Sequence, residues 1–485
     1  MRVGFGTSVR VLCLLIGAGS SVPPAAAQAP RAATMVSRAD AYLKASVRHD
    51  QFSGTVLIAK DGVPVMHRGY GMANYELQVP NSPRSVFLIG SLSKQFTAVA
   101  ILQLRDRGRL TLTDPICKYL DRCPEAWKPV TLRHLLTHTS GIFNISSLPE
   151  WDDSLSMRRF DRVDFLDVVR ERPLLFAPGA EYKYSNTGYY LLGLVIDRVS
   201  GTSYEEYLHR NIFAPLGMTS TRVDDGRTLV PNRTTGYYWA ANSFVHALPQ
   251  NVLLSLGSGG ILSTTGDLLR WDAALYTDTI LSRSSRDEMF TPVLKEYGYG
   301  WEIRTTHGRP SLTHSGSQAG FSAYFMRLPT ERVTVIVLSN SDRTSAGKVA
   351  NALAAIYFGV PYRMPEAQLF DILGSTIAMK GVAASVHQYR ELKRSQPEKY
   401  DYGEEMLNDL GYDLLLAGKS ADALAVFTLM VEMFPGSSNA YDSLGEAYMA
   451  LGEKALSIKN YERSLQLDPE NVNAVGRLAK LRRGP

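Results

Sequence analysis

The stretch GTVLIAKDGVPVM at Gly54–Met66 decides the fold class, because it predicts a β-hairpin. Two runs rich in strand-forming residues flank the pair Asp61-Gly62, and an Asp-Gly pair in this setting is a strong signal for a tight turn. Further runs typical of strands lie far downstream, at 297–303, 320–327 and 333–338. Strand segments therefore occur near both ends of a span of almost 300 residues.

The segment between these strands, from about residue 94 to residue 269, has mostly helical and loop-like patterns. Helices are also expected before the hairpin, at 36–47, and after the last strand, at 347–358. Strands that enclose a helical insert imply an antiparallel sheet closed by distant segments. The expected fold class is α+β, an antiparallel sheet flanked by helices with an inserted all-helical lobe, and the cleft between the lobes is the natural place for a site.

The C-terminal part has an internal repeat with a period of thirty-four residues. Six residues recur at this offset: Leu410, Gly411, Gly418, Ala421, Phe427 and Pro435 return as Leu444, Gly445, Gly452, Ala455, Tyr461 and Pro469. The pattern resembles the tetratricopeptide repeat (TPR), in which small residues let two antiparallel helices approach and proline ends the second helix. We expect a TPR-like all-α module at 366–485, with a degenerate first repeat and a final capping helix; an ordinary helical bundle is the alternative.

Length and composition set limits on the class of protein. A chain of 485 residues exceeds what one hydrophobic core usually organises, so two or three domains are expected. The net charge of +5 is small, and because no long Lys/Arg run accompanies it, nucleic acid is not an expected partner. Two cysteines, Cys117 and Cys123, follow the N-terminal region, and their spacing allows either a local disulfide or two free thiols.

The first 27 residues have the pattern of an export signal. Arg2 and Arg10 precede an apolar stretch at 11–18, and Ala25-Ala26-Ala27-Gln28 suits a small-residue cleavage site. A membrane anchor would need about 18 or more apolar residues, and glycines and a proline interrupt this segment. We therefore expect a periplasmic or secreted protein without a stable membrane anchor, and a first structural domain at 35–360.

The segment LIGSLSK at Leu88–Lys94 indicates nucleophilic chemistry, because it leads directly into an apolar helical run. A serine hydroxyl is a poor nucleophile until a neighbouring base takes its proton. Residues three apart on a helix lie on one face, so Lys94 is within reach of Ser91. The helix N-terminus disfavours an ammonium on Lys94 and favours an oxyanion at Ser91. A capping serine followed by a solvated lysine would explain the same motif.

Two later motifs strengthen the nucleophilic interpretation. Tyr184-Ser185-Asn186 follows a Pro-Gly turn and precedes a helix, and a phenol beside a lysine can exchange protons with a serine or a leaving group. His314-Ser315-Gly316 stands at the end of a predicted strand and is followed by Ser317. The glycine at this point would let a substrate backbone approach the strand closely.

The order S-x-x-K, Y-x-N and H-x-G resembles the serine β-lactamase/DD-peptidase superfamily, in particular the branch with class C β-lactamases, D-aminopeptidases and related esterases. Three further stretches support the resemblance: His134–Gly141, Asn211–Met218 and Gly257–Ile261. The resemblance implies acylation of Ser91, with Lys94 and Tyr184 as the proton-handling pair. It also implies that Asn186 holds the substrate amide and orients Lys94, and that the backbone N–H groups of Ser91 and Ser317 form an oxyanion hole.

His314 departs from the lysine that β-lactamases usually have in the third motif. This favours an exported enzyme of the D-amino-acid peptidase, carboxypeptidase or esterase type that cleaves an amide or ester, and makes a true β-lactamase the alternative. An imidazole with a reference pKa of about 6.5 would bind anionic substrates only in mildly acid solution, so this recognition should weaken as pH rises. A further alternative is an idle scaffold whose TPR-like module binds protein.

Other sequence patterns give weaker indications of function. His134 and His138 are four apart and could share a helix face as metal ligands, but structural roles are favoured, and neither a metal nor a cofactor is expected. The glycines from Gly257 to Gly266 are interpreted as a loop that borders the active site. Tyr237, Tyr238 and Trp239 either line the substrate pocket or merely pack. The expected partners are a small-molecule or peptide substrate and, through the TPR-like module, a protein.

Overall fold

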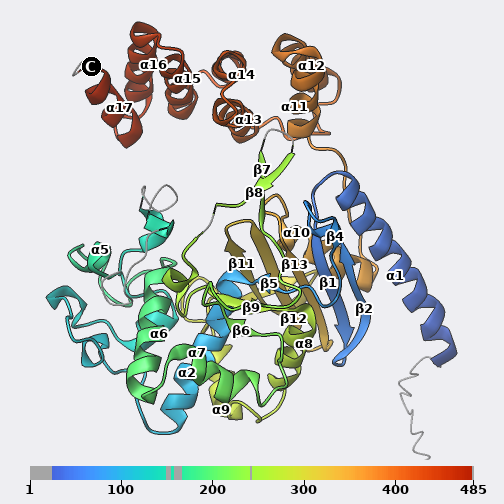
Figure 1. Ribbon diagram of the computed structural model, residues 1–485, viewed down its shortest axis with the longest axis vertical. Coiled ribbons are helices and arrows are strands. Elements are labelled where there is room, and N and C mark those ends of the chain that lie inside the picture. Colours follow the sequence, from blue (N-terminus) through green and yellow to red (C-terminus); the bar gives the residue numbers. More distant parts are fainter. Residues whose placement is uncertain (1–24, 149–154, 158–165, 241–242, 249, 483–485) are drawn as a thin grey trace, which may run out of the picture.

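The computed structural model describes residues 25–148, 155–157, 166–240, 243–248 and 250–482 (Figure 1). Its centre is a six-stranded antiparallel sheet with the strand order β10-β11-β12-β13-β1-β2. The strands are β1 (Gly54–Lys60), β2 (Val63–Tyr70), β10 (Glu302–Thr306), β11 (Arg309–Gln318), β12 (Phe321–Leu328) and β13 (Val333–Ser339). The α+β fold expected from the sequence is confirmed.

The sheet is closed by segments from distant parts of the chain. β1 pairs with β13 in the register Gly54↔Ser339, and the predicted hairpin turns through Gly62 at φ 76°. One strand differs from the prediction, because the run expected at 297–303 forms a strand only from Glu302 onwards. Gly300 has φ 74°, and a Cβ there would lie 2.9 Å from the backbone oxygen of Lys94, so the chain must bend at this point.

Helices cover both faces of the sheet, and β1 shows how the faces are divided. Val56 and Ile58 pack into a core with α1 (Ala25–Arg48) and α10 (Ala346–Phe358), whereas Leu57 and Ala59 face the opposite core. Successive side chains on a strand point to opposite faces, so the fully apolar run of β1 is that of a strand covered on both sides. On the second face α8 (Thr265–Ala274) packs against β1 and β13 (Figure 1).

The insert between β2 and β10 contains helices joined by loops, as expected, but it is not all-helical, because short strands also occur in it. Its helices are α2 (Ser93–Asp106), α3 (Leu132–Leu136), α5 (Asp167–Arg170), α6 (Asn186–Ser200), α7 (Tyr204–Leu208), α8 and α9 (Arg283–Met289). It also holds short strands, namely β3 (Met72–Asn74), β4 (Val79–Pro80), β5 (Phe87–Leu88), β6 (Arg222–Val223), β7 (Tyr237–Ala240), β8 (Ser243–His246) and β9 (Ile261–Ser263). Cys117 and Cys123 form a disulfide, with their Cα atoms 5.3 Å apart.

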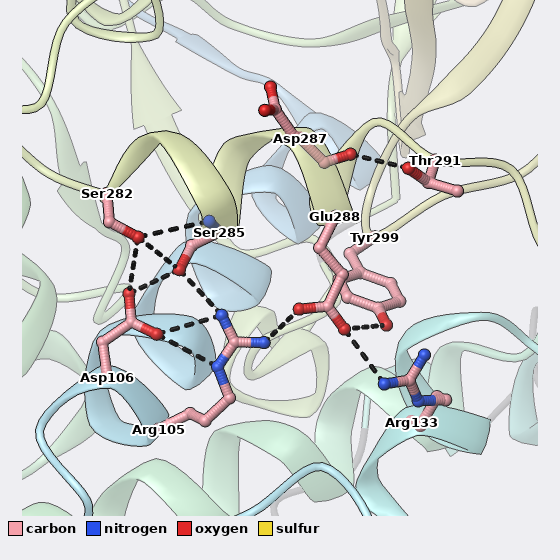
Figure 2. Close-up of polar contacts among 9 residues, drawn as sticks. All are labelled: Arg105, Asp106, Arg133, Ser282, Ser285, Asp287, Glu288, Thr291 and Tyr299. Atoms are coloured by element: carbon pink, nitrogen blue, oxygen red, sulfur yellow. Dashed lines mark hydrogen bonds and ion pairs between the residues drawn. The ribbon is translucent and has the colours of Figure 1, made fainter.

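A polar network fixes the C-terminal end of α2, the helix that follows Ser91. Figure 2 shows the Arg105 guanidinium between Asp106 and Glu288, with Ser285 beside them. The Glu288 carboxylate also accepts hydrogen bonds from Arg133 (3.0 Å) and from the Tyr299 hydroxyl (2.9 Å). These contacts join α2 to α9 and α3 and so hold the helix in a fixed position relative to its neighbours.

The C-terminal module consists of antiparallel helices. They are α11 (Leu369–Lys380), α12 (Val382–Ser395), α13 (Glu404–Leu416), α14 (Ser420–Met433), α15 (Ser438–Ala450), α16 (Lys454–Leu467) and α17 (Val472–Arg482). The repeated glycines have a clear packing role, because a Cβ on Gly411 would lie 2.3 Å from the Phe427 ring and one on Gly445 would lie 3.2 Å from the Tyr461 ring. The thirty-four-residue offset therefore places an equivalent close contact in two successive helix pairs.

The N-terminal region is described only from α1 onwards. Residues 1–24 of the predicted export signal lie outside the described residues, and Ala25 begins α1. Within the described part of the chain, none of the helices combines the length and the apolar character that crossing a membrane requires.

Candidate active site

Ser91 lies in a 3-10 turn, Gly90–Leu92, directly before α2. Gly90 has φ 53°, and a Cβ on it would lie 2.7 Å from the backbone nitrogen of Ser317 on β11. A Cβ on Gly316 would lie 2.0 Å from the backbone oxygen of Ile89. Two glycines thus let this turn pack against β11 backbone to backbone. Gly316 was expected to admit a substrate, but the chain's own Ile89 occupies that space.

Lys94 is buried completely, and its side-chain nitrogen has three partners. Nζ lies 3.0 Å from Ser91 Oγ, 2.8 Å from Asn186 Oδ1 and 2.7 Å from the Ser258 backbone oxygen. The first contact is the one that the three-residue spacing predicts. The third comes from the glycine-rich segment that was expected to border the site.

Burial of Lys94 favours the neutral form of its amine. Burial lowers the pKa of the Lys94 ammonium well below its usual value. The Asn186 Oδ1 and the Ser258 carbonyl oxygen can only accept hydrogen bonds. A neutral amine that donates its two N–H groups to these oxygens has one lone pair left, and Ser91 Oγ is the remaining contact of Nζ. The arrangement therefore suits transfer of the Ser91 proton to Lys94.

Tyr184 and Asn186 approach Lys94 from the start of α6. The Asn186 amide donates a hydrogen bond from Nδ2 to Ser146 Oγ (3.0 Å), which fixes Oδ1 towards Lys94. The Tyr184 ring centre lies 4.8 Å from Lys94 Nζ. Burial raises the pKa of Tyr184 above its usual value, and a hydrogen bond with Ser91 opposes this effect only in part. Tyr184 is thus a protonated phenol near neutral pH, which can donate a proton.

His138 contacts this site, although the sequence analysis gave it only a general structural role. Its ring centre lies 4.2 Å from that of Tyr184, and its Nδ1 accepts a hydrogen bond from the Ser185 backbone N–H (3.1 Å). His138 follows α3 with φ 57°, while His134 caps that helix by accepting from the Thr131 N–H. The two imidazoles therefore do not share a helix face as a metal pair would, and His138 holds the Tyr184–Asn186 segment.

His314 differs from the expectation of a titrating anion-binding group. Its side chain is buried, its Nε2 lies 3.0 Å from the Tyr297 hydroxyl, and its Nδ1 lies 2.6 Å from the Ser315 backbone oxygen. Burial is the main cause that lowers the pKa of His314 to about 3. The imidazole is consequently neutral in mildly acid and in neutral solution, and the reference pKa of about 6.5 does not apply.

A cavity of about 280 Å³ opens beside Ser91. It is lined by Ser91, Ile145, Ser146, Asn186, Tyr190, Tyr238, Gln250, Leu254, Ser255, Ser258, Gly259, Ser317, Gln318, Ala319 and Asp342. Of the aromatic run on β7, Tyr238 lines this cavity, Tyr237 is buried, and Trp239 borders a second cavity. The two alternatives for this run, lining the substrate pocket or packing in the core, therefore apply to Tyr238 and Tyr237 respectively. Asp342 was not singled out from the sequence.

Comparisons with known proteins agree with this geometry. A family model described as Beta-lactamase matches residues 29–357, and a tetratricopeptide repeat model matches residues 438–471. Penicillin-binding protein 4* of Bacillus subtilis is 35% identical over 342 residues, which cover 65% of this chain and 74% of that protein. The octameric penicillin-binding protein homologue from Pyrococcus abyssi has a TM-score of 0.61 at 28% identity, over 71% of this chain and 82% of its own.

A D-amino acid amidase from Ochrobactrum anthropi is similar in fold, with a TM-score of 0.60 at 20% identity over 67% of this chain and 99% of the amidase chain. The family match extends from α1 to the end of α10 and so includes the sheet, Ser91, Lys94, Tyr184 and β11. The chain therefore belongs to the beta-lactamase family of serine hydrolases, with a tetratricopeptide repeat in its C-terminal module.

Proposed function

We propose that this protein hydrolyses an amide or ester bond through an acyl-enzyme formed on Ser91. The observation that supports this most strongly is the contact of the buried Lys94 Nζ with Ser91 Oγ at 3.0 Å, beside two carbonyl oxygens that can only accept hydrogen bonds. A serine needs a neighbouring base to become a nucleophile, and a desolvated lysine is such a base.

In the proposed mechanism Ser91 Oγ attacks the carbonyl carbon while its proton moves to Lys94. The resulting oxyanion accepts hydrogen bonds from the backbone N–H groups of Ser91 and Ser317. Tyr184 donates its proton to the leaving nitrogen or oxygen and regains one from the Lys94 ammonium, so the bond breaks and the acyl-enzyme remains. Water then attacks the carbonyl carbon of the acyl-enzyme ester, and the same groups move the protons in the opposite direction. The carboxylic acid product and free Ser91 are released.

The preferred substrate type is a peptide or small ester rather than a β-lactam. The fold neighbour from Ochrobactrum anthropi is named a D-amino acid amidase, an enzyme of the amide-cleaving type proposed for this chain. In the third motif His314 stands where β-lactamases usually have a lysine. Because His314 is buried and neutral, this motif offers no positive charge to the carboxylate of a β-lactam. An inert scaffold is disfavoured because it would have no need of Ser91, Lys94 and Tyr184 together.

We also propose that residues 1–27 direct export to the periplasm or outside the cell, that 35–360 form the hydrolase domain, and that 366–485 form a module that offers a surface to a protein partner. Separate apolar cores support this division. Two cores draw their buried residues from positions up to 356, and two others draw theirs from 369 onwards. Extended concave surfaces of stacked repeats are typical protein-binding surfaces.

Covalent labelling tests the proposed function. A fluorophosphonate or a penicillin-type probe should attach to Ser91, as mapped by mass spectrometry, and Ser91→Ala should abolish labelling and turnover together. Ser315→Ala is a matched control, because Ser315 is an exposed serine on the neighbouring strand β11. Labelling that maps to any other serine would refute the assignment.

A further inference from the structure

The charge of the cavity beside Ser91 is unusual for a site that would bind a carboxylate. Among the described residues that line it there is neither lysine nor arginine, and Asp342 is the one side chain with a carboxylate, whose pKa is raised because neighbouring protein atoms partly desolvate it. Asp342 is exposed, whereas Lys94 lies buried beneath the cavity. A substrate that enters this cavity therefore meets a single negative charge.

Asp342 is held in place by β7. The Trp239 backbone N–H donates a hydrogen bond to Asp342 Oδ1 (3.0 Å), and the Asp342 N–H donates to the Tyr237 backbone oxygen (3.2 Å). Tyr237 also bridges to Ser341. The carboxylate thus occupies a defined position on the cavity wall, which is what a recognition group requires.

The next residue, Arg343, could neutralise Asp342 but is directed elsewhere. Its guanidinium lies 4.2 Å from the centre of the Trp239 ring and forms an ion pair with Asp371 of α11. The Arg343 side chain is only 7% exposed. Figure 1 shows the β7–β8 hairpin reaching towards the first helices of the C-terminal module, where this ion pair forms. The module therefore supplies the carboxylate that forms an ion pair with Arg343, while the charge of Arg343 lowers the pKa of Asp342 only in part.

We propose that Asp342 binds the ammonium group of an amine-bearing acyl donor, and that Asp371 keeps Arg343 from neutralising it. This inference rests on the proposed hydrolysis at Ser91 and specifies its substrate class, namely amides or esters of amino acids or peptides with a free amino group. A carboxylate that meets an ammonium forms a charge-assisted hydrogen bond, which is about twice as strong as a neutral one. The cavity of about 280 Å³ suits a small aminoacyl group.

The test compares matched substrates. Aminoacyl p-nitroanilides with a free α-amino group are measured against the same compounds with an N-acetyl group, in both enantiomers, and the ratio of the two kcat/KM values is recorded. The wild type should favour the free amine. Asp342→Asn keeps the size of the side chain and removes its charge, so the ratio should fall roughly tenfold.

The role of the C-terminal module is tested by a second series. Asp371→Asn should lower the ratio about threefold, because Arg343 is then drawn towards Asp342. The double variant Asp371→Asn/Arg343→Gln should restore the ratio, which a merely structural effect of Asp371 would not do. Glu432→Gln is the control, since it removes an exposed ion pair with Arg390 inside the module, far along the chain from β7.

The outcomes separate the inference from the proposed function. A wild type that labels at Ser91 and hydrolyses the N-acetyl substrate, but shows no preference for the free amine, overturns the inference alone. An Asp342→Asn variant with an unchanged ratio also overturns it. If Ser91 takes no label and neither substrate is hydrolysed, the proposed function fails as well.

Discussion

Lys94 and Asp342 lie at the two ends of one site and have opposite surroundings. Lys94 is fully buried, and this burial lowers the pKa of its ammonium, so a group that is normally a cation becomes a base. Asp342 is exposed on the cavity wall, and its carboxylate accepts a hydrogen bond from the Trp239 backbone N–H of β7. Desolvation thus prepares the chemical end of the site, whereas at the recognition end desolvation raises the pKa of Asp342 and is opposed by backbone hydrogen bonds and by the charge of Arg343. The following predictions alter one end at a time.

The largest effect is expected when the buried end loses its amine. Lys94→Met keeps an unbranched apolar side chain and removes the base, so kcat/KM should fall about 10³-fold or more for every substrate. For the wild type, kcat/KM should fall at acid pH as Lys94 gains a proton, with a midpoint well below the usual lysine pKa of 10.5. Lys60→Met, at an exposed position, is the control. A Lys94→Met enzyme with more than a tenth of the wild-type rate would contradict Lys94 as the base.

Tyr184→Phe should separate amides from activated esters. A leaving amine must be protonated, whereas p-nitrophenolate leaves without a proton. Amide turnover should therefore fall about 10²-fold or more, and p-nitrophenyl ester turnover should fall at least tenfold less. Tyr182→Phe serves as the control, since its ring also contacts His138, whereas the hydrogen bond with Ser91 is made by Tyr184. An equal loss for both substrates would mean that Tyr184 acts on the attacking serine rather than on the leaving group.

Removal of the C-terminal module should change only the recognition end. A chain that stops after Tyr362 should still fold and hydrolyse a small N-acetyl ester within a few-fold of the full chain. Its preference for a free amine should decline about threefold, because Asp371 is gone and Arg343 can approach Asp342. Arg343→Gln in the shortened chain should restore the preference. A soluble but inactive shortened chain would show instead that the module supports the catalytic end.

The smallest effect concerns His314. The ratio of kcat/KM for a carboxylate-bearing ester to that for a neutral ester should stay flat from pH 6 to pH 9. The pKa of His314 is lowered to about 3, so the imidazole gains its charge only below that range. Titration of Lys94 changes kcat/KM by the same factor for both esters, so it does not change their ratio. A ratio that falls as pH rises through about 6.5 would mean that His314 titrates as an exposed histidine does.

The sequence predicts the parts of this molecule that depend on local patterns. The hairpin at Gly54–Met66, the Ser91–Lys94 spacing and the thirty-four-residue repeat are each set by residues close together in the chain. Their structural outcomes follow from turn geometry, helix periodicity and the packing of small residues against aromatic rings. The family resemblance rests on the order of such local motifs.

Features that depend on burial and on distant contacts could not be predicted. The pKa of His314 follows from its position behind Tyr184 and beside Tyr297, and no residue next to it in the sequence indicates that burial. Asp342 reaches the cavity because its neighbours pair with β7, about one hundred residues earlier in the chain. His138 meets Tyr184 only after α3 and α6 have packed together. These are tertiary effects, to which motif spacing is not sensitive.

The pairing of β1 with β13 also has a consequence for biosynthesis. Gly54 finds its partner Ser339 only after almost three hundred further residues have been added, and Ser91 needs β11 beside it to complete the site. Contacts between such distant segments form late and slowly. An unfinished chain therefore presents the β1–β2 hairpin with an unpaired edge that other chains can join. Catalytic activity should be absent from every nascent chain that ends before β13, so hydrolysis cannot begin until synthesis has passed Ser339.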